Sequence, residues 1–281
     1  MADAGAYLRD LFNIEDRTVV VTGAAGFFGR YIAETFLHAG ARVVLLGRSA
    51  ALAGRCEAYA REFGDGRCVA RLVDFYDTPA LDAVCAEVAT AYEPSVLVNN
   101  AFDFSTRTGF NTPAGRLESS TLDQWASAFQ SGIYWAVRTT QIIGGSMRAR
   151  KAGSIINISS MYGAVSPKPD LYEGTSFFNP PSYGVVKAGL LAFTRYVASF
   201  WGADGIRCNA LLPGAFPNLE SRSANAVADG DEFLDRLAGR TLLRRVGHPR
   251  DLRGALLLLA SDAGGYITGQ GLVIDGGWTV N

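Results

Sequence analysis

A tyrosine and a lysine four positions apart are the residues of this sequence best suited to acid–base chemistry. Tyr183 and Lys187 lie in the segment Ser-Tyr-Gly-Val-Val-Lys, and in a helix this spacing puts both side chains on one face, one turn apart. An ammonium group beside a phenol stabilises the phenolate and lowers the phenol pKa from about 10 toward neutral pH. Such a pair can exchange a proton with a hydroxyl or carbonyl substrate. Surface pairs at this spacing are common by chance, so the neighbouring motifs must decide.

A glycine-rich segment near the N-terminus indicates a nucleotide site. The apolar run Val19–Val21 is followed by Thr-Gly-Ala-Ala-Gly-Phe-Phe-Gly, which contains Gly23, Gly26 and Gly29. Glycines allow a tight turn and the close approach of backbone amides to a pyrophosphate at a helix N-terminus. The same letters could form a plain turn, but a predicted strand before them and an amphipathic helix after them favour nucleotide binding.

The end of the second predicted strand distinguishes the two nicotinamide dinucleotides. An acidic residue there would bind the adenosine ribose hydroxyls, whereas an arginine accommodates a 2′-phosphate. This chain has Gly47 at the acidic position and Arg48 after it, and a guanidinium can bind phosphate through two hydrogen bonds. The sequence therefore favours NADP, with NAD as the alternative if Arg48 is only a solvated surface residue.

Composition bounds the class of protein. The chain has 281 residues, 48% hydrophobic and 19% charged, which suits one large α/β domain with a substantial core. The net charge of −1 predicts no binding of nucleic acid or of an anionic membrane. Residues 1–16 lack the apolar core of a secretory signal, and the run 255–260 is too short to span a bilayer. We expect a cytoplasmic protein whose partner is a small-molecule substrate.

The cysteines and histidines are too scattered to predict a metal site. There are four cysteines and two histidines, and none forms a spaced cluster of the kind that binds zinc. The six residues are Cys56, Cys68, Cys85, Cys208, His38 and His248. We expect reduced, mostly buried thiols, structural histidines and no metal.

Short β-branched runs alternate with longer helical patterns along the whole chain. This order predicts a Rossmann-type, doubly wound parallel sheet of about seven strands, with helices on both faces. The predicted strands are Thr18–Val21, Arg42–Leu46, Cys68–Val73, Val96–Val98, Ser154–Ile158, Ile206–Leu211 and Leu272–Ile274. The predicted helices include Arg30–Ala39, Leu81–Ala91, Leu122–Met147, Tyr183–Trp201 and Asp251–Ala260. No linker or repeat divides the chain, so residues 1–281 are predicted to form a single domain.

Three segments depart from this alternation. Residues 1–15 form an N-terminal extension. Residues 165–181 contain four prolines, which predict a loop. Residues 218–240 are polar, contain Gly230 and lie between a strand and a helix, so they are predicted to form a substrate lid.

Taken together, these motifs resemble the short-chain dehydrogenase/reductase family, compact single-domain type, over about residues 15–281. The motifs, in family order, are Thr22-Gly23…Gly26…Gly29, Asp74, Asn99-Asn100-Ala101, Asn157-Ile158-Ser159-Ser160, Tyr183…Lys187, Pro213-Gly214 and Gly269-Gln270-Gly271…Asp275-Gly276-Gly277. The resemblance implies an oxidoreductase that interconverts a secondary alcohol and a ketone by hydride transfer from or to the cofactor.

The resemblance also implies roles for individual residues. Tyr183 is expected to exchange the proton, Lys187 to lower its pKa and hold the nicotinamide ribose, and Ser160 to hydrogen-bond the substrate carbonyl. The expected cofactor-binding residues are Gly23, Gly26, Phe27, Phe28, Gly29, Arg48, Asp74, Phe75, Asn100, Ala101, Tyr183, Lys187, Pro213, Gly214 and Phe216.

The sequence departs from the family pattern at four places. Phe27 stands where a small residue is usual, and Phe102 where a glycine is usual, which makes the floor of the site bulkier and places Phe102 among the expected substrate residues. Gly132 replaces the helix asparagine whose backbone carbonyl holds a relay water, and a glycine could keep the helix kink and that carbonyl. The interval from Ser160 to Tyr183 is longer than usual.

That longer interval, together with the first glycine turn and residues 213–218, is similar to a subgroup of bacterial surface-polysaccharide and flagellin-glycan pathways. Residues 165–181 are expected at the mouth of the active site as an ordered wall over the nicotinamide pocket, with Tyr172 or Glu173 directed toward a sugar or sugar derivative. The loop could instead pack on a neighbouring subunit. Two other functions stay open: a ketoreductase of secondary metabolism that acts on a hydrophobic ketone, and a non-catalytic nucleotide-sensing protein with the same fold.

The family usually assembles through its two long helices and its last strand, so the resemblance implies a homotetramer or a homodimer. Six residues give the long helices more apolar surface than one sheet face need bury. They are Tyr134, Trp135, Leu190, Phe193, Tyr196 and Phe200.

Overall fold

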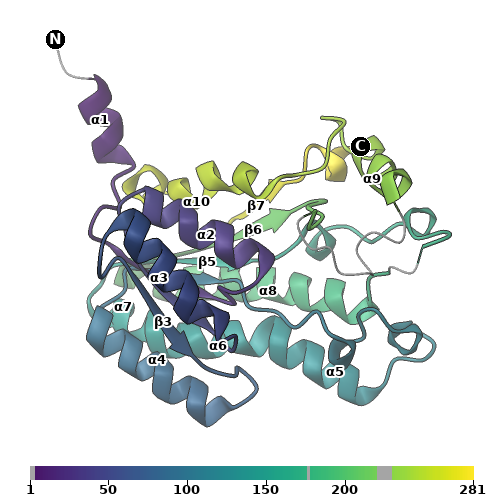
Figure 1. Ribbon diagram of the computed structural model, residues 1–281, viewed down its shortest axis with the longest axis horizontal. Coiled ribbons are helices and arrows are strands. Elements are labelled where there is room, and N and C mark those ends of the chain that lie inside the picture. The colour runs from purple at the N-terminus through teal and green to yellow at the C-terminus, as the bar shows by residue number, and fades with distance from the viewer. Residues whose placement is uncertain (1–3, 176–177, 220–229) are drawn as a thin grey trace.

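A seven-stranded parallel sheet forms the centre of the computed structural model, which describes residues 4–175, 178–219 and 230–281 (Figure 1). The strands lie in the order β3-β2-β1-β4-β5-β6-β7, so the chain reverses its direction of travel across the sheet after β3. Their bounds are β1 Thr18–Thr22, β2 Arg42–Gly47, β3 Cys68–Leu72, β4 Val96–Asn99, β5 Gly153–Ile158, β6 Ile206–Pro213 and β7 Gly271–Ile274. The predicted fold class is confirmed.

Helices cover both faces of the sheet (Figure 1). On one face, α2 (Phe27–His38), α3 (Ala51–Phe63) and α10 (Arg253–Ala260) pack on a core that includes Ile32, Leu52 and Leu256. On the other lie α4 (Thr78–Tyr92), α5 (Leu122–Phe129), α6 (Trp135–Thr139), α7 (Gly145–Ala149) and α8 (Pro181–Trp201). The central strands are apolar on both faces because helices bury both of them.

The long helix predicted over Leu122–Met147 is interrupted. Two π-helical turns, Gln130–Tyr134 and Thr140–Gly144, separate α5, α6 and α7. Sequence periodicity over so short a stretch does not separate a π turn from an α turn, since a π turn adds only one residue.

Two further helices lie outside the sheet layers. Helix α1 (Ala4–Leu11) belongs to the N-terminal extension and projects from the rest of the fold, and α9 (Gly230–Gly239) belongs to the predicted lid (Figure 1). Residues 220–229 of that lid lie outside the described residues. The loop predicted over residues 165–181 contains one 3₁₀ turn, Pro169–Leu171, and its positions 176–177 also lie outside the described residues.

Within the described ranges, no helix has the length and apolar character needed to cross a membrane. In the same part of the chain, no three histidine, cysteine, aspartate or glutamate side chains come close enough together to hold a metal ion.

Candidate active site

The residues of the sequence motifs meet at the carboxyl edge of the sheet. Strands β1, β4, β5 and β6 end there side by side, and a cavity of about 320 Å³ opens above them. It is lined by Gly23, Gly26, Phe27, Phe28, Asn100, Ala101, Phe102, Phe104, Ile158, Ser159, Ser160, Tyr183, Lys187, Pro213, Gly214 and Phe216. A parallel sheet places ligand sites at this edge, next to the point where the strand order reverses.

The glycine turn packs too tightly for side chains. Gly23 has φ +64°, and a Cβ there would lie 2.7 Å from the Cα of Ala101. A Cβ on Gly29 would lie 2.3 Å from the carbonyl oxygen of Gly23. Gly26 precedes α2 and donates its N–H to that same carbonyl at 3.0 Å. The free amides at the start of α2 therefore face the cavity, as pyrophosphate binding requires.

Asn100 and Thr22 fasten the turn to the end of β4. The Asn100 side-chain amide donates to the carbonyl oxygens of Thr22 (2.9 Å) and Gly23 (3.2 Å). The Thr22 hydroxyl accepts the backbone N–H groups of Asn100 (2.9 Å) and Ala101 (3.0 Å). These four bonds fix the two loops between which a dinucleotide would lie.

Two phenylalanines extend this wall. Phe27 and Phe28 stack at 5.4 Å between ring centroids, and Phe28 meets Phe216 edge-on at 5.5 Å. Phe27 therefore lines the cavity, and its bulky ring does not fill the space beside the glycine turn. The loop after β6, which carries Pro213, Gly214 and Phe216, is joined to the α2 side by this aromatic contact.

A smaller cavity of about 110 Å³ continues from the glycine turn toward β2 and β3. Gly47, Arg48, Asp74, Phe75 and Ala101 contribute to it, and the Arg48 side chain is exposed at its rim. One Asp74 carboxylate oxygen accepts the N–H of Tyr76 at 3.0 Å. These residues could hold an adenine ring and a phosphate on its ribose.

The three expected catalytic residues lie together in the larger cavity. The Ser160 hydroxyl accepts the N–H of Tyr162 at 3.1 Å and lies close enough to the Tyr183 phenol to lower its pKa. Lys187 Nζ donates to the carbonyl oxygen of Ile158 at 2.8 Å. The Lys187 backbone carbonyl accepts from the Ser159 hydroxyl at 2.8 Å. Both the side chain and the backbone of Lys187 therefore bind the end of β5 and hold α8 against it.

Burial sets the ionisation of the tyrosine–lysine pair. It raises the pKa of Tyr183 to about 12, an effect that the hydrogen bond from Ser160 opposes. It lowers the pKa of Lys187 to about 7. The sequence predicted that Lys187 lowers the pKa of the Tyr183 phenol. In the protein alone that pKa is raised instead, because burial disfavours both the phenolate and the ammonium. At neutral pH Tyr183 is a phenol, the form that donates a proton.

Three phenylalanines surround the Tyr183 ring. Phe102, Phe104 and Phe110 approach it at centroid distances of 5.3, 6.0 and 5.4 Å. Phe102 also lies 5.1 Å below Lys187 Nζ. Phe104 and Phe110 were not among the predicted site residues, although their clustering just after the Asn-Asn-Ala motif was a signal that could have found them.

Gly132 lies in the first π-helical turn, against α8. A Cβ at this position would lie 2.4 Å from Val186 Cγ2 and 3.2 Å from the Phe102 ring. The asparagine that is usual in the family does not fit here, because Val186 and Phe102 occupy its space. The bulky Phe102 and the glycine at 132 are thus two parts of one packing arrangement.

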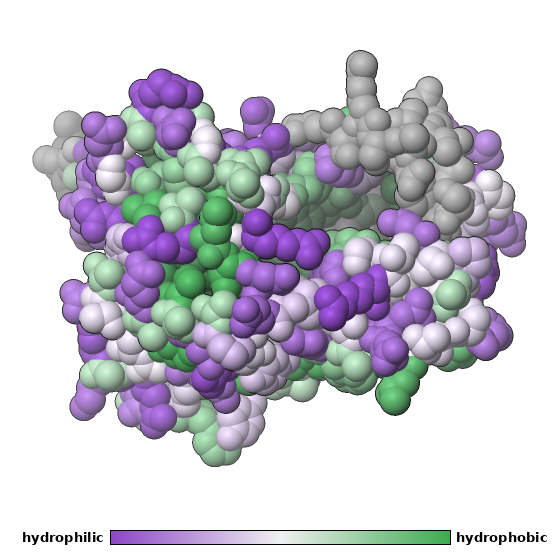
Figure 2. All heavy atoms as spheres, turned by 60° about the horizontal axis from the view of Figure 1, so that its bottom comes forward, coloured by the Kyte–Doolittle hydropathy of each residue, from purple (hydrophilic) through white to green (hydrophobic). Residues whose placement is uncertain are grey.

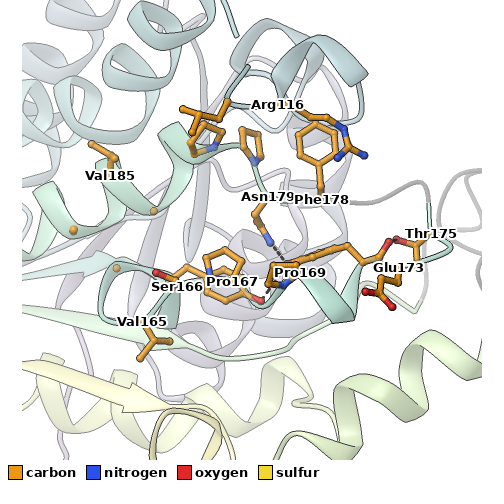
Figure 3. A pocket seen from close by; sticks show the side chains of 18 of the residues that line it. Arg116, Val165, Ser166, Pro167, Pro169, Glu173, Thr175, Phe178, Asn179 and Val185 are labelled. Atoms are coloured by element: carbon orange, nitrogen blue, oxygen red, sulfur yellow. Dashed lines mark hydrogen bonds between the residues drawn. The ribbon is translucent and has the colours of Figure 1, made fainter. Parts of the chain in front are cut away.

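Tyr172 and Glu173 lie beside a cavity that also contains Tyr162, Gly163 and Gly184, the sequence neighbours of Ser160 and Tyr183. This second cavity has a volume of about 1080 Å³, with Pro167 and Pro169 of the insertion on one side and Arg116 and Phe178 on the other (Figure 3). Neither residue lines the cavity of Tyr183. Glu173 is exposed, and its carbonyl oxygen accepts from Arg236 at 2.7 Å.

The insertion packs against the segment that follows Ser160. Leu171 packs with Met161 and Trp278 in a small separate core. The Tyr172 hydroxyl lies 3.2 Å from that of Tyr162 and also accepts from Asn179. Tyr172 is still close enough to Tyr183 to raise the pKa of its phenol. The wall over the nicotinamide pocket, with Tyr172 or Glu173 directed into it, stays a prediction.

Comparisons with known proteins agree with this geometry. A family model described as Enoyl-(Acyl carrier protein) reductase matches residues 23–279. The galactitol 2-dehydrogenase (L-tagatose-forming) of Cereibacter sphaeroides is 31% identical over 272 residues, which is 97% of this chain and 98% of that protein. The 7alpha-hydroxysteroid dehydrogenase of Bacteroides fragilis is 28% identical over 272 residues, covering 95% of this chain and 96% of that protein.

A solved structure gives the same result for the fold. The L-sorbose reductase of Gluconobacter frateurii, crystallised with NADPH and L-sorbose, superposes with a TM-score of 0.80 at 26% identity, over 97% of this chain and 99% of that one. This chain belongs to the short-chain dehydrogenase/reductase family and is an NAD(P)-dependent oxidoreductase.

Proposed function

We propose that the protein interconverts a secondary alcohol and a ketone of a sugar or polyol, with NADP(H) as the hydride carrier. One observation carries the proposal: Tyr183, Ser160 and Lys187 line the same cavity as the glycine turn, with Lys187 Nζ 5.6 Å from the centroid of the Tyr183 ring. This arrangement supplies a proton donor, a second hydrogen-bond donor and a dinucleotide cradle around one reacting carbon.

The cofactor supplies the hydride, and the chain supplies the proton and its placement. In ketone reduction, Tyr183 Oη gives its proton to the substrate oxygen as the hydride reaches the carbonyl carbon. The Ser160 oxygen accepts from Tyr162 N–H. Its own proton, which stabilises the Tyr183 oxygen in the protein alone, would turn to the substrate oxygen and steady the developing oxyanion. Lys187, one turn along α8, would then stabilise the phenolate. Alcohol oxidation reverses each of these steps.

Arg48 supports NADP over NAD as the cofactor. Its exposed side chain borders the smaller cavity directly after Gly47, which leaves the end of β2 without the acidic residue that would bind the ribose hydroxyls. The L-sorbose reductase to which the chain is similar was crystallised with NADPH.

The names of relatives support a sugar or polyol substrate. Galactitol dehydrogenase and sorbose reductase both act on polyhydroxylated chains by their printed names. A role in surface-polysaccharide or flagellin-glycan synthesis is the finer hypothesis. It rests on the 165–181 insertion, in which Tyr172 lies close enough to Tyr183 to raise the pKa of that phenol.

A hydrophobic ketone is the second candidate substrate. Phe102, Phe104 and Phe110 present an apolar surface around Tyr183, and one relative is a hydroxysteroid dehydrogenase. A polyol would leave some of its hydroxyl groups against these rings, whereas a steroid would bury apolar area there.

A substrate panel separates these candidates. The purified protein is assayed for NADPH consumption with ketoses and with hydrophobic ketones, and for NADP reduction with polyols and with hydroxysteroids. We expect turnover with at least one ketose or polyol and none in Tyr183→Phe. Turnover only with steroids or other apolar ketones would select the second candidate, and no turnover with either class would refute the substrate proposal.

A further inference from the structure

Two cysteines that the sequence leaves unconnected are brought together by the fold. Cys56 lies in the middle of α3 and Cys68 begins β3, and their sulfur atoms are 2.6 Å apart. The chain returns to the sheet through Gly64 and Gly66, both with positive φ (98° and 76°). This turn lets the strand run back beneath the helix that precedes it.

We propose that Cys56 and Cys68 are a redox-sensitive pair that closes to a disulfide when the protein meets a peroxide. In the reduced protein the two sulfurs share one hydrogen bond, so the side chains already point at each other and closure requires little movement of α3 against β3. Disulfides in cytoplasmic proteins are commonly transient and redox-sensing rather than structural.

The two thiols are chemically unequal, which gives the reaction an order. The hydrogen bond from Cys68 lowers the pKa of Cys56, with Arg55 acting in the same direction, and the same hydrogen bond raises the pKa of Cys68. Cys56 is therefore the better thiolate nucleophile.

The atoms and electrons balance with one peroxide per pair. The Cys56 thiolate attacks a peroxide oxygen, its O–O bond breaks, and sulfenic acid and water form after proton uptake. The Cys68 sulfur then displaces the sulfenic oxygen as a second water, and the S–S bond forms. Two thiols are oxidised by two electrons, and hydrogen peroxide is reduced to two waters. A dithiol reductant reverses the reaction.

The other two cysteines provide an internal comparison. Cys85 and Cys208 are fully buried in the core on the other face of the sheet. Burial raises the pKa of each thiol to about 12. Peroxide should leave both in the thiol form while the native fold persists.

The bridge would join two parts of the cofactor site. Arg55, next to Cys56, donates to the carbonyl oxygen of Ala24 in the glycine turn at 3.2 Å. The β3 strand leads to Asp74 and Phe75 of the smaller cavity. A disulfide would therefore restrain α3, the helix that contacts the glycine turn, against the strand that leads to the predicted adenine site.

Peptide mapping tests the pair directly in the wild-type protein. Reduced protein is treated with a few equivalents of hydrogen peroxide, blocked with iodoacetamide and cleaved with trypsin. Cleavage after Arg55, Arg61, Arg67 and Arg71 isolates each cysteine in its own short peptide, 56–61 and 68–71. We expect these peptides as one species joined by a disulfide, lighter than their sum by two hydrogen atoms and separated by dithiothreitol.

Thiol counts and stability complete the test. The number of titratable thiols in denaturant should fall from four to two when the wild type is oxidised. In Cys56→Ser and Cys68→Ser, which cannot form the 56–68 bridge, peroxide should not lower the thiol count by that route. The oxidised wild type should melt roughly 5–10 °C higher than the reduced protein, because the bridge lowers the conformational entropy of the unfolded chain. Any of three results would overturn the proposal: four unbridged thiols, sulfinic acid at one cysteine alone, or disulfides only between chains. The peptide mapping uses the wild type, so it does not depend on the folding of a variant.

Discussion

At the scale of single residues, the site is controlled by burial as much as by charge. Tyr183 and Lys187 were predicted from their spacing, and their meeting with Ser160 follows from the motif order. The direction of their pKa shifts could not be predicted from sequence, since it depends on Phe102, Phe104 and Phe110 enclosing them. The protein alone therefore holds Tyr183 as the proton donor for ketone reduction.

Arg48→Ala tests the choice of cofactor. A charge-assisted hydrogen bond contributes about 1.5–3 kcal/mol, so we expect NADPH affinity to fall ten-fold or more, with NADH affinity nearly unchanged. Fluorescence titration measures both dissociation constants. Arg42→Ala, at the opposite end of the same strand and also exposed, is the matched control. A wild type that already prefers NADH would show that Arg48 is only a surface residue.

Lys187→Met tests the cost of burying the lysine. The pKa of Lys187 is about 7 in the folded protein against an ordinary 10.5, so between these values the unfolded chain binds more protons and wild-type stability rises with pH. We expect Lys187→Met to be inactive yet more stable, with a gain in unfolding free energy that is greatest below pH 7 and disappears toward pH 10.5. Denaturant melts at several pH values measure this gain.

Lys151→Met is the control for that experiment, because Lys151 is exposed on the surface. Its stability should follow the wild type at every pH. A Lys187→Met variant that is less stable than the wild type at pH 6 would mean that the ammonium–carbonyl bond to Ile158 outweighs the desolvation cost.

At the scale of elements, the strands could be predicted from the sequence, whereas the π turns and the course of the 165–181 insertion could not. The strands of the sheet were found from apolar runs, because burial on both faces leaves that mark on the sequence. The π turns of the α5–α7 region and the direction of the 165–181 insertion depend on tertiary contacts, such as Val186 against Gly132 and Leu171 against Trp278. Local sequence contains neither contact.

Gly132→Ala tests the contact between the π turn and α8. The added Cβ would lie 2.4 Å from Val186 Cγ2, and overpacking of this kind costs about 1–3 kcal/mol of unfolding free energy. Gly145→Ala, where a Cβ would meet no atom within 4 Å, should be neutral or slightly stabilising. Thermal melts compare the two variants. Equal melting temperatures would contradict a tight contact, and relief of the loss by Val186→Ala would locate it.

At the scale of the whole molecule, apolar surface outside the site predicts assembly. Apolar side chains gather on the face that carries the helices drawn lowest in Figure 1, beside a hollow (Figure 2). Tyr196 and Phe200 on α8 are 58% and 62% exposed and stack at 4.3 Å. Trp135 and Leu190, which were predicted to contribute to the same surface, are buried in the fold and are corrected to core residues.

We therefore propose a homotetramer or homodimer that uses the exposed surface of α8. Light scattering at micromolar concentration should give a mass above that of one chain, 30.0 kDa, and Phe200→Asp should lower it. Tyr7→Asp, at an exposed aromatic residue of α1, away from the long helices and the last strand, should leave the mass unchanged. A monomeric wild type would refute the assembly and leave the exposed rings unexplained.

Tyr183→Phe tests the central claim most directly. The substitution removes the phenol oxygen and keeps the ring that packs against Phe102 and Phe110. With the substrate found in the panel, we expect ketone reduction to fall by a factor of about a hundred or more, the low end of general acid catalysis, while NADPH affinity stays close to that of the wild type. If the variant keeps a larger share of the wild-type rate, a group other than Tyr183 transfers the proton.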